Sequence, residues 1–123
     1  MANMIRWFEI PVKDLQRAVK FYSKIFKTEL TIMSDGHREM AVFPIEESEE
    51  VTGALVSGAG YNPGSEGALI YLNANPDLSA VLKRVGEAGG VVVAPKQKIG
   101  SEFGYMAIIL DSEGNRIALN SKE

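Results

Sequence analysis

The two halves of this chain repeat one order of predicted elements: a strand, a helix and then three strands. Each predicted helix begins at an Asp-Leu pair, Asp14-Leu15 in the first half and Asp77-Leu78 in the second. Between the halves, residues 58–66 are rich in glycine and contain a proline, which is typical of a linker or a long loop. This repeat constrains the fold strongly, because one helix covers only one face of a four-stranded sheet.

We therefore predict an α+β fold in which two βαβββ modules form a curled mixed sheet, a half-barrel with the helices outside. The whole chain, 1–123, is expected to be a single domain. Module 1 spans about 4–57, module 2 spans about 67–121, and the linker 58–66 joins them. The concave side of such a sheet is a natural cavity for a ligand.

The spacing of apolar residues defines the individual elements. Apolar side chains three and four residues apart predict helices over 14–27 and 77–88. Alternating apolar residues between turn signals predict the strands, and Pro95 is expected to end the strand that begins at Val91. The predicted strands span residues 5–12, 29–33, 37–44, 51–57, 68–73, 91–94, 104–110 and 116–120.

The composition excludes several classes of function. The chain contains no cysteine, so disulfides, thiolate nucleophiles and cysteine zinc sites are ruled out. Its formal charge of −3 leaves no basic footprint for nucleic acid or an anionic membrane. No apolar stretch approaches the ~20 residues that cross a bilayer. We expect a soluble, cytoplasmic protein with neither nucleic acid nor membrane as a partner.

Three stretches carry a family resemblance: Phe8–Tyr22, Leu82–Val93 and Asp111–Ile117. The first is similar to the opening strand and helix of the vicinal oxygen chelate superfamily. The third, which begins Asp111-Ser112-Glu113-Gly114-Asn115, is similar to the Asp-Pro-(Asp/Glu)-Gly-Asn turn before the last strand of that superfamily. This superfamily includes glyoxalase I, bleomycin-resistance proteins and extradiol dioxygenases. The resemblance implies the half-barrel fold, a small-molecule ligand and a homodimer. It does not imply one activity, because this fold hosts many chemistries.

The resemblance also implies a metal site, since most enzymes of this superfamily bind a divalent ion through His, Glu or Gln of the inward strand faces. The matching positions hold Trp7, Ala68 and Ala118, and strand 51–57 contains no His, Asp, Glu or Gln. We therefore predict neither a metal ion nor another cofactor, and not a typical metal-dependent glyoxalase I. A shifted site built from Glu9 and His37 is the alternative, but no third ligand is evident.

Strand alternation predicts which side chains face the cavity. The inward residues would include Ala68 and Ala118, which makes the cavity largely apolar with a few polar groups. Trp7 either stacks on a flat ligand or fills the space that a metal would occupy. The predicted ligand-binding residues are Trp7, Glu9, Ile70, Leu72, Arg116 and Asn120.

Glu9 is the candidate catalytic residue. A carboxylate inside a curved sheet should have a pKa raised by burial, which would suit a general base. The alternative is a structural ion pair, with Arg116 as the expected partner. His37, the single histidine, lies beside the turn signal Ser34-Asp35-Gly36, so an exposed edge position is favoured over a catalytic role.

Two main functions follow. The first is a metal-independent protein that binds a small apolar or aromatic organic molecule in the concave cavity. The second is an isomerase, lyase or dioxygenase-type enzyme that acts on a small carbonyl compound with Glu9 as its base. A third, less specific possibility is a protein-binding module that uses the linker and the acidic loop 46–50.

Overall fold

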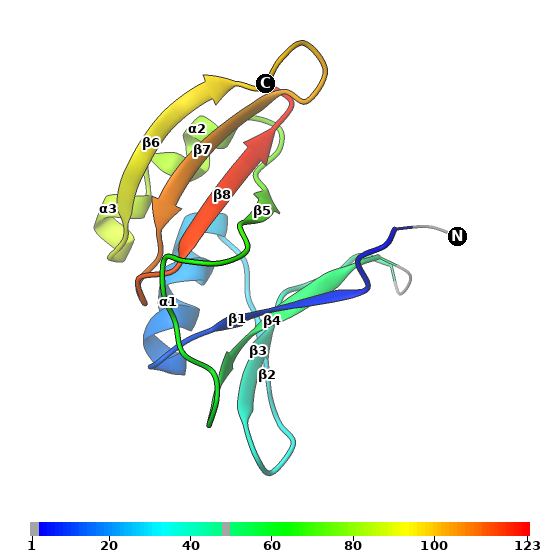
Figure 1. Ribbon diagram of the computed structural model, residues 1–123, viewed down its shortest axis with the longest axis vertical. Coiled ribbons are helices and arrows are strands. Elements are labelled where there is room, and N and C mark those ends of the chain that lie inside the picture. Colours follow the sequence, from blue (N-terminus) through cyan, green and yellow to red (C-terminus); the bar gives the residue numbers. More distant parts are fainter. Residues whose placement is uncertain (1–2, 48–49) are drawn as a thin grey trace.

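The computed structural model describes residues 3–47 and 50–123, so residues 48–49 of the predicted acidic loop lie outside it. The first half contains β1 (Trp7–Pro11), α1 (Leu15–Phe26), β2 (Thr31–Ser34), β3 (Glu39–Val42) and β4 (Thr52–Ser57) (Figure 1). The second half contains β5 (Ile70–Asn73), α2 (Leu78–Leu82), α3 (Val85–Ala88), β6 (Val91–Lys98), β7 (Tyr105–Leu110) and β8 (Arg116–Ser121).

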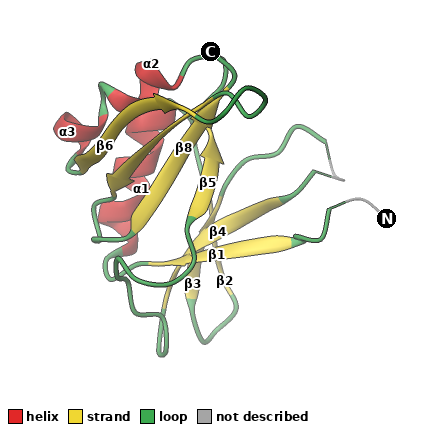
Figure 2. Ribbon diagram, turned by 45° about the horizontal axis from the view of Figure 1, so that its top comes forward, coloured by secondary structure: helices red, strands yellow, loops and turns green. Residues whose placement is uncertain are grey.

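The two halves form sheets with the same topology. The strand order is β1-β4-β3-β2 in the first sheet and β5-β8-β7-β6 in the second. The pairs β1–β4 and β5–β8 are parallel, and the remaining pairs are antiparallel. Figure 2 shows the helices grouped on one side while the two sheets open away from each other. The predicted α+β fold with two curled βαβββ units is therefore confirmed.

The helix α1 joins the two halves through its buried face. Asp14 caps its start by accepting a hydrogen bond from the backbone N–H of Arg17 at 3.1 Å, and Lys27 ends it in a left-handed conformation. The helix contacts β3 and β4 on one side and α2 and α3 on the other. Among the residues that the structure describes, neither this 12-residue helix nor any other has the length and apolar character to cross a membrane. The buried residues of α1 are Leu15, Ala18, Phe21, Tyr22 and Ile25.

The second predicted helix, 77–88, is interrupted in the structure. It divides into α2 and α3, with Lys83 and Arg84 between them. Arg84 has φ −92° and ψ −11°, outside regular helix geometry, and its guanidinium donates to the carbonyl of Ile25 at 2.9 Å. That carbonyl lies in the last turn of α1, where basic side chains stabilise unpaired backbone oxygens. The break thus accompanies a contact between the two halves.

The prediction that Pro95 ends its strand is wrong, because β6 continues to Lys98. Two features explain how the strand tolerates a proline. β6 is the edge strand of its sheet, so the missing N–H faces no partner, and its register with β7 shifts between Val92 and Ala94 and again between Ala94 and Gln97. Proline is compatible with strands at such edges and bulges.

Buried polar groups in the turn before β8 form hydrogen bonds with the first half of the chain. The Tyr22 hydroxyl donates to Asp111 at 2.7 Å, and the Asn115 amide donates to the carbonyl of Pro11 at 2.7 Å and to Asp111 at 3.0 Å. Burial and the Asp111 carboxylate raise the pKa of Tyr22 well above its ordinary value. Two of the stretches that carry the family resemblance therefore contact each other across the fold.

Candidate functional site

A largely apolar cleft of about 790 Å³ lies between the β1–β4 end of the first sheet and β5 of the second. Its volume is in the range of small-molecule sites. Glu9 is the only charged residue in the described lining, and the aliphatic part of the wall includes Ile5, Leu69 and Ile70. The aromatic side chains that line this cleft, here called the apolar cleft, are Trp7, Phe8, Phe26, Phe43 and Tyr71.

A second, smaller pocket of about 400 Å³ adjoins the first. Its walls come from the linker, from β1 and β5, from Asn115 in the turn before β8, and from Arg116 at the start of β8. Glu9, Ala68 and Ile70 line both spaces. The two spaces therefore meet along the facing edges of β1 and β5, and one ligand can extend from the apolar cleft into this polar pocket.

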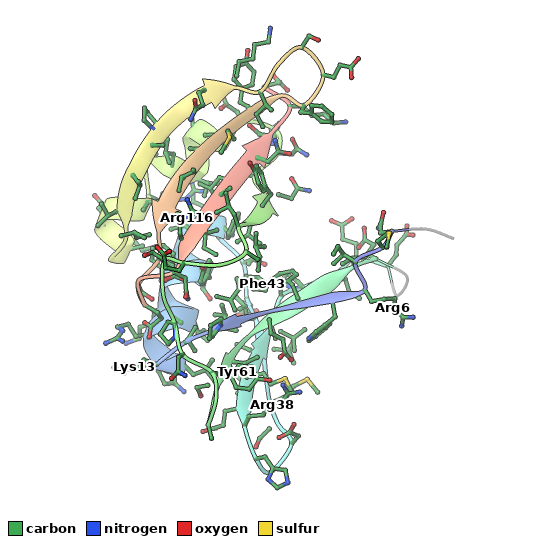
Figure 3. The ribbon with its side chains drawn as sticks, viewed as in Figure 1. Arg6, Lys13, Arg38, Phe43, Tyr61 and Arg116 are labelled. Atoms are coloured by element: carbon green, nitrogen blue, oxygen red, sulfur yellow. The ribbon has the colours of Figure 1, made fainter. Side chains whose placement is uncertain are left out.

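Glu9 is held by four hydrogen bonds at the boundary between these spaces. Its Oε1 accepts from the Tyr61 hydroxyl at 2.8 Å and from Arg38 at 3.1 Å. Its Oε2 accepts from Arg38 at 2.9 Å and from the Trp7 indole N–H at 3.2 Å. Arg38 also contacts the Tyr61 hydroxyl and pairs with Asp35 at 3.0 Å. Figure 3 shows Arg38 and Tyr61 together on the same side of β1.

These contacts overturn the prediction that the pKa of Glu9 is raised. Burial acts in that direction, but the hydrogen bonds from Tyr61 and Trp7 and the charge of Arg38 outweigh it, so the pKa lies below its ordinary value. The alternative of an ion pair is confirmed, although its partner is Arg38 and not the expected Arg116. Arg116 instead begins β8 in the other sheet.

The structure places four of the predicted ligand-binding residues in the apolar cleft: Trp7, Glu9, Ile70 and Leu72. The predicted facing of Ile70 and Leu72 is nevertheless wrong. β5 pairs them with Ile117 and Leu119 of β8, so they share the face that packs against the helices. Alternation alone could not assign this strand because 68–72 is apolar on both faces.

The other two predicted ligand-binding residues lie apart from this group. Arg116 lines the polar pocket together with Glu9 and Ile70. The Asn120 amide instead donates to the carbonyls of Phe103 and Tyr105 at 3.1 and 2.8 Å, and Asn120 is not among the described residues that line either space. Asn120 therefore positions the loop before β7.

Sequence reasoning missed Arg38 as part of this site. A signal for it existed: a carboxylate expected inside the sheet requires a cation or several donors nearby. Arg38 follows the turn that starts at Asp35, and its position in the fold depends on how β3 is registered against β4. His37, its neighbour, is exposed as predicted, and its backbone N–H donates to Asp35 at 3.0 Å.

The side chains at the positions that the sequence resemblance assigns to the metal, Trp7, Ala68 and Ala118, do not fit a divalent ion. The indole of Trp7 offers an N–H donor, and Ala68 and Ala118 offer methyl groups. Glu9 already accepts four hydrogen bonds, which matches the lone-pair capacity of a carboxylate. Within residues 3–47 and 50–123, no three His, Asp or Glu side chains gather in a group that could hold a metal. The shifted site with Glu9 and His37 therefore lacks a third ligand in this part of the chain.

Comparison with known proteins identifies the family. The model of the Glyoxalase/Bleomycin resistance protein/Dioxygenase superfamily matches residues 4–119, and the chain belongs to this family. A glyoxylase-like domain-containing protein of Didymella fabae is 30% identical over 120 residues, which cover 95% of this chain and 92% of that protein. The resemblance inferred from the three sequence stretches is therefore confirmed.

Solved structures share the fold. A glyoxalase/bleomycin resistance protein from Albidiferax ferrireducens T118 superposes with a TM-score of 0.69 at 19% identity, covering 98% of this chain and 100% of that one. TnmS3, an antibiotic binding protein from Streptomyces sp. CB03234, superposes with a TM-score of 0.65 at 24% identity, covering 100% and 99%. At these identities the likeness establishes the architecture and no activity.

Proposed function

We propose that this protein binds a small apolar or aromatic organic molecule in the apolar cleft, without the metal ion of the family's enzymes. The observation that carries the proposal is the cleft itself: about 790 Å³, with five aromatic residues and one charged residue in its described lining. Aromatic rings supply large contact areas with little loss of conformational entropy, which suits a flat apolar ligand. The negative charge of Glu9 is balanced by Arg38.

Binding accounts for Glu9 better than catalysis does. A general base works best when its pKa is close to the working pH, and when a lone pair is free to take the proton. The pKa of Glu9 is lowered, and its oxygens accept from Tyr61, Arg38 and Trp7. The carboxylate therefore holds the linker against β1. The antibiotic-binding neighbour TnmS3 supports a binding role for this architecture.

The test uses N-phenyl-1-naphthylamine, a neutral dye whose emission rises in apolar surroundings. Trp7 is the only tryptophan and lines the cleft, so quenching of its fluorescence reports occupation of this site directly. We expect saturable dye binding with micromolar Kd, with the dye signal and the Trp7 signal following the same curve. Absence of saturable binding would contradict the proposal.

Two matched variants locate the dye. Ala68 is exposed and lines both spaces, so Ala68→Phe fills the junction between them. Ala80→Phe adds the same ring at an exposed position on α2, outside both spaces. We expect at least a tenfold weaker dye affinity for Ala68→Phe and an unchanged affinity for Ala80→Phe. Equal affinities in the two variants would place the dye elsewhere.

The metal-free part of the proposal has its own test. The dye Kd should stay within twofold after dialysis against EDTA and after addition of Zn²⁺, Ni²⁺ or Mn²⁺, because the positions of Trp7, Ala68 and Ala118 supply no ligand atoms. A tenfold change in Kd on metal removal or addition would show that an ion takes part in the site.

We also propose that the protein is a cytoplasmic homodimer. Family membership supports the dimer, and β6 carries three exposed valines at an open sheet edge, Val91, Val92 and Val93. Exposed apolar groups on an edge strand favour association. Sedimentation equilibrium should give twice the 13.4 kDa chain mass at micromolar concentration, and a monomer at that concentration would contradict the proposal.

A further inference from the structure

Arg116 is the only basic residue in the described lining of either space. It is the first residue of β8, and its neighbour Ile117 packs in the core. Successive side chains of a strand point to opposite faces, so Arg116 lies on the sheet face away from the helices. Figure 3 shows Arg116 at the start of β8, on the opposite side of β1 from Arg38.

Arg38 forms ion pairs with Glu9 and Asp35, whereas Arg116 forms no ion pair with a described carboxylate. Among the described residues, the basic partners in ion pairs within 4.0 Å are Arg17, Arg38 and Lys96, and none of these pairs involves Arg116. Glu9 shares the polar pocket, but its carboxylate is paired with Arg38 at 2.9 Å. Glu66, on the exposed linker, is the other carboxylate in the pocket lining.

We propose that the ligand is an amphipathic organic acid whose apolar body fills the apolar cleft and whose carboxylate pairs with Arg116. This inference rests on the proposed binding function and specifies its ligand class. The two spaces meet at Glu9, Ala68 and Ile70, so a single molecule reaches both. A planar guanidinium binds a carboxylate through two parallel hydrogen bonds, which fixes the orientation of the acid as well as its affinity.

The overall charge of the protein means that any preference for an acid must come from residues inside the pocket. A chain with a formal charge of −3 repels anions in general, so a preference for an acid over its neutral isostere has to arise locally. Arg116 is the described residue in the pocket that supplies such a local preference. Glu66 opposes it, because a second carboxylate in the same pocket competes for the guanidinium.

The experiment is displacement of bound N-phenyl-1-naphthylamine by two matched compounds, 2-naphthoate and 2-naphthamide. The two share the ring system and nearly the same shape, and they differ in charge at pH 7. We expect 2-naphthoate to displace the dye at about tenfold lower concentration than 2-naphthamide. Equal displacement by acid and amide would overturn the inference while leaving the proposed function standing. Failure of the dye itself to bind would overturn both.

Four variants test the assignment to Arg116. Arg116→Gln should abolish the preference for the acid, because it weakens displacement by 2-naphthoate far more than displacement by 2-naphthamide, and Arg116→Lys should keep part of the preference. Glu66→Gln should increase the affinity for 2-naphthoate about twofold to threefold. Lys20→Gln removes one positive charge at an exposed position on α1 and should leave the acid preference intact. A preference that survives in Arg116→Gln, or that Lys20→Gln removes equally, would refute the role of Arg116.

Discussion

Glu113 should make the folded state sensitive to acid through a single buried carboxylate. Its side chain is fully buried and accepts hydrogen bonds from the backbone N–H groups of Lys13 and Asp14, each at 2.9 Å. Arg17 donates to its two oxygens at 2.7 and 2.9 Å, and the Ser112 hydroxyl donates at 3.0 Å. Burial alone would raise the pKa of Glu113, but these donors lower it from 4.5 to about 2.

The direction of the effect follows from linkage. The pKa of Glu113 is lower in the folded than in the unfolded chain, so its contribution to stability is complete above pH 4.5 and is lost as the pH falls toward 2. The difference between the two pKa values corresponds to about 3 kcal/mol. About 2 kcal/mol of this is lost between pH 7 and pH 3.

The assay is urea unfolding at pH 7 and pH 3 of the wild type, Glu113→Gln and the control Glu102→Gln, whose side chain is on an exposed loop. Acidification should cost the wild type and the control about 2 kcal/mol more than it costs Glu113→Gln. Asp35 and Asp77, whose pKa values are also lowered, are present in all three proteins, so their effects cancel in the comparison. An equal loss in wild type and Glu113→Gln would refute the reasoning.

Three further predictions can be tested by urea unfolding at pH 7, and the last of them also by amide hydrogen exchange. Tyr22→Phe removes a buried donor from Asp111 and should cost about 1–3 kcal/mol; a smaller loss would mean that water replaces the hydroxyl. Gly53→Ala should cost about 1–3 kcal/mol, since its Cβ would lie 2.2 Å from the carbonyl oxygen of Phe8, whereas Gly86→Ala in α3 meets open space and should stabilise by about 0.5 kcal/mol. Equal effects of the two alanines would contradict the packing described for β1 and β4. Glu9→Gln should cost about 1 kcal/mol and speed amide exchange in the linker around Tyr61, and unchanged exchange there would mean that Glu9 does not anchor it.

The sequence was sufficient for the fold because its strongest signals are local and repeated. Asp14 and Asp77 both cap helices, as their positions before an apolar periodic stretch indicated. Where prediction failed, the local sequence was compatible with two structures, and pairing with a strand from another part of the chain decided between them. Pro95 is compatible with either a strand end or an edge bulge, and pairing with β7 selects the bulge. The facing of Ile70 and Leu72 was ambiguous in the same way until β5 was paired with β8.

The site was harder to predict than the fold because its partners come from distant parts of the chain. That Trp7 offers no metal ligand can be read from the sequence alone. That Arg38 and Tyr61 converge on Glu9 cannot, because one follows a turn before β3 and the other lies in the linker. The predicted ion pair was correct in kind, since an inward carboxylate needs compensation, but the sequence contained several arginines that could provide it.

Trp7, at the position that the resemblance assigns to a metal ligand, contacts Glu9 and also lines the apolar cleft. A charged group at the border of an apolar space is stable only when its lone pairs are satisfied. Trp7 contributes its ring to the cleft wall and its indole N–H to Glu9 at 3.2 Å, so one side chain serves both needs. A metal ion at this carboxylate would have to displace donors from Trp7, Arg38 and Tyr61. With Glu9 paired to Arg38, the other charged residues in the described lining of the two spaces are Arg116 and Glu66, so the proposed preference for an acid depends on Arg116.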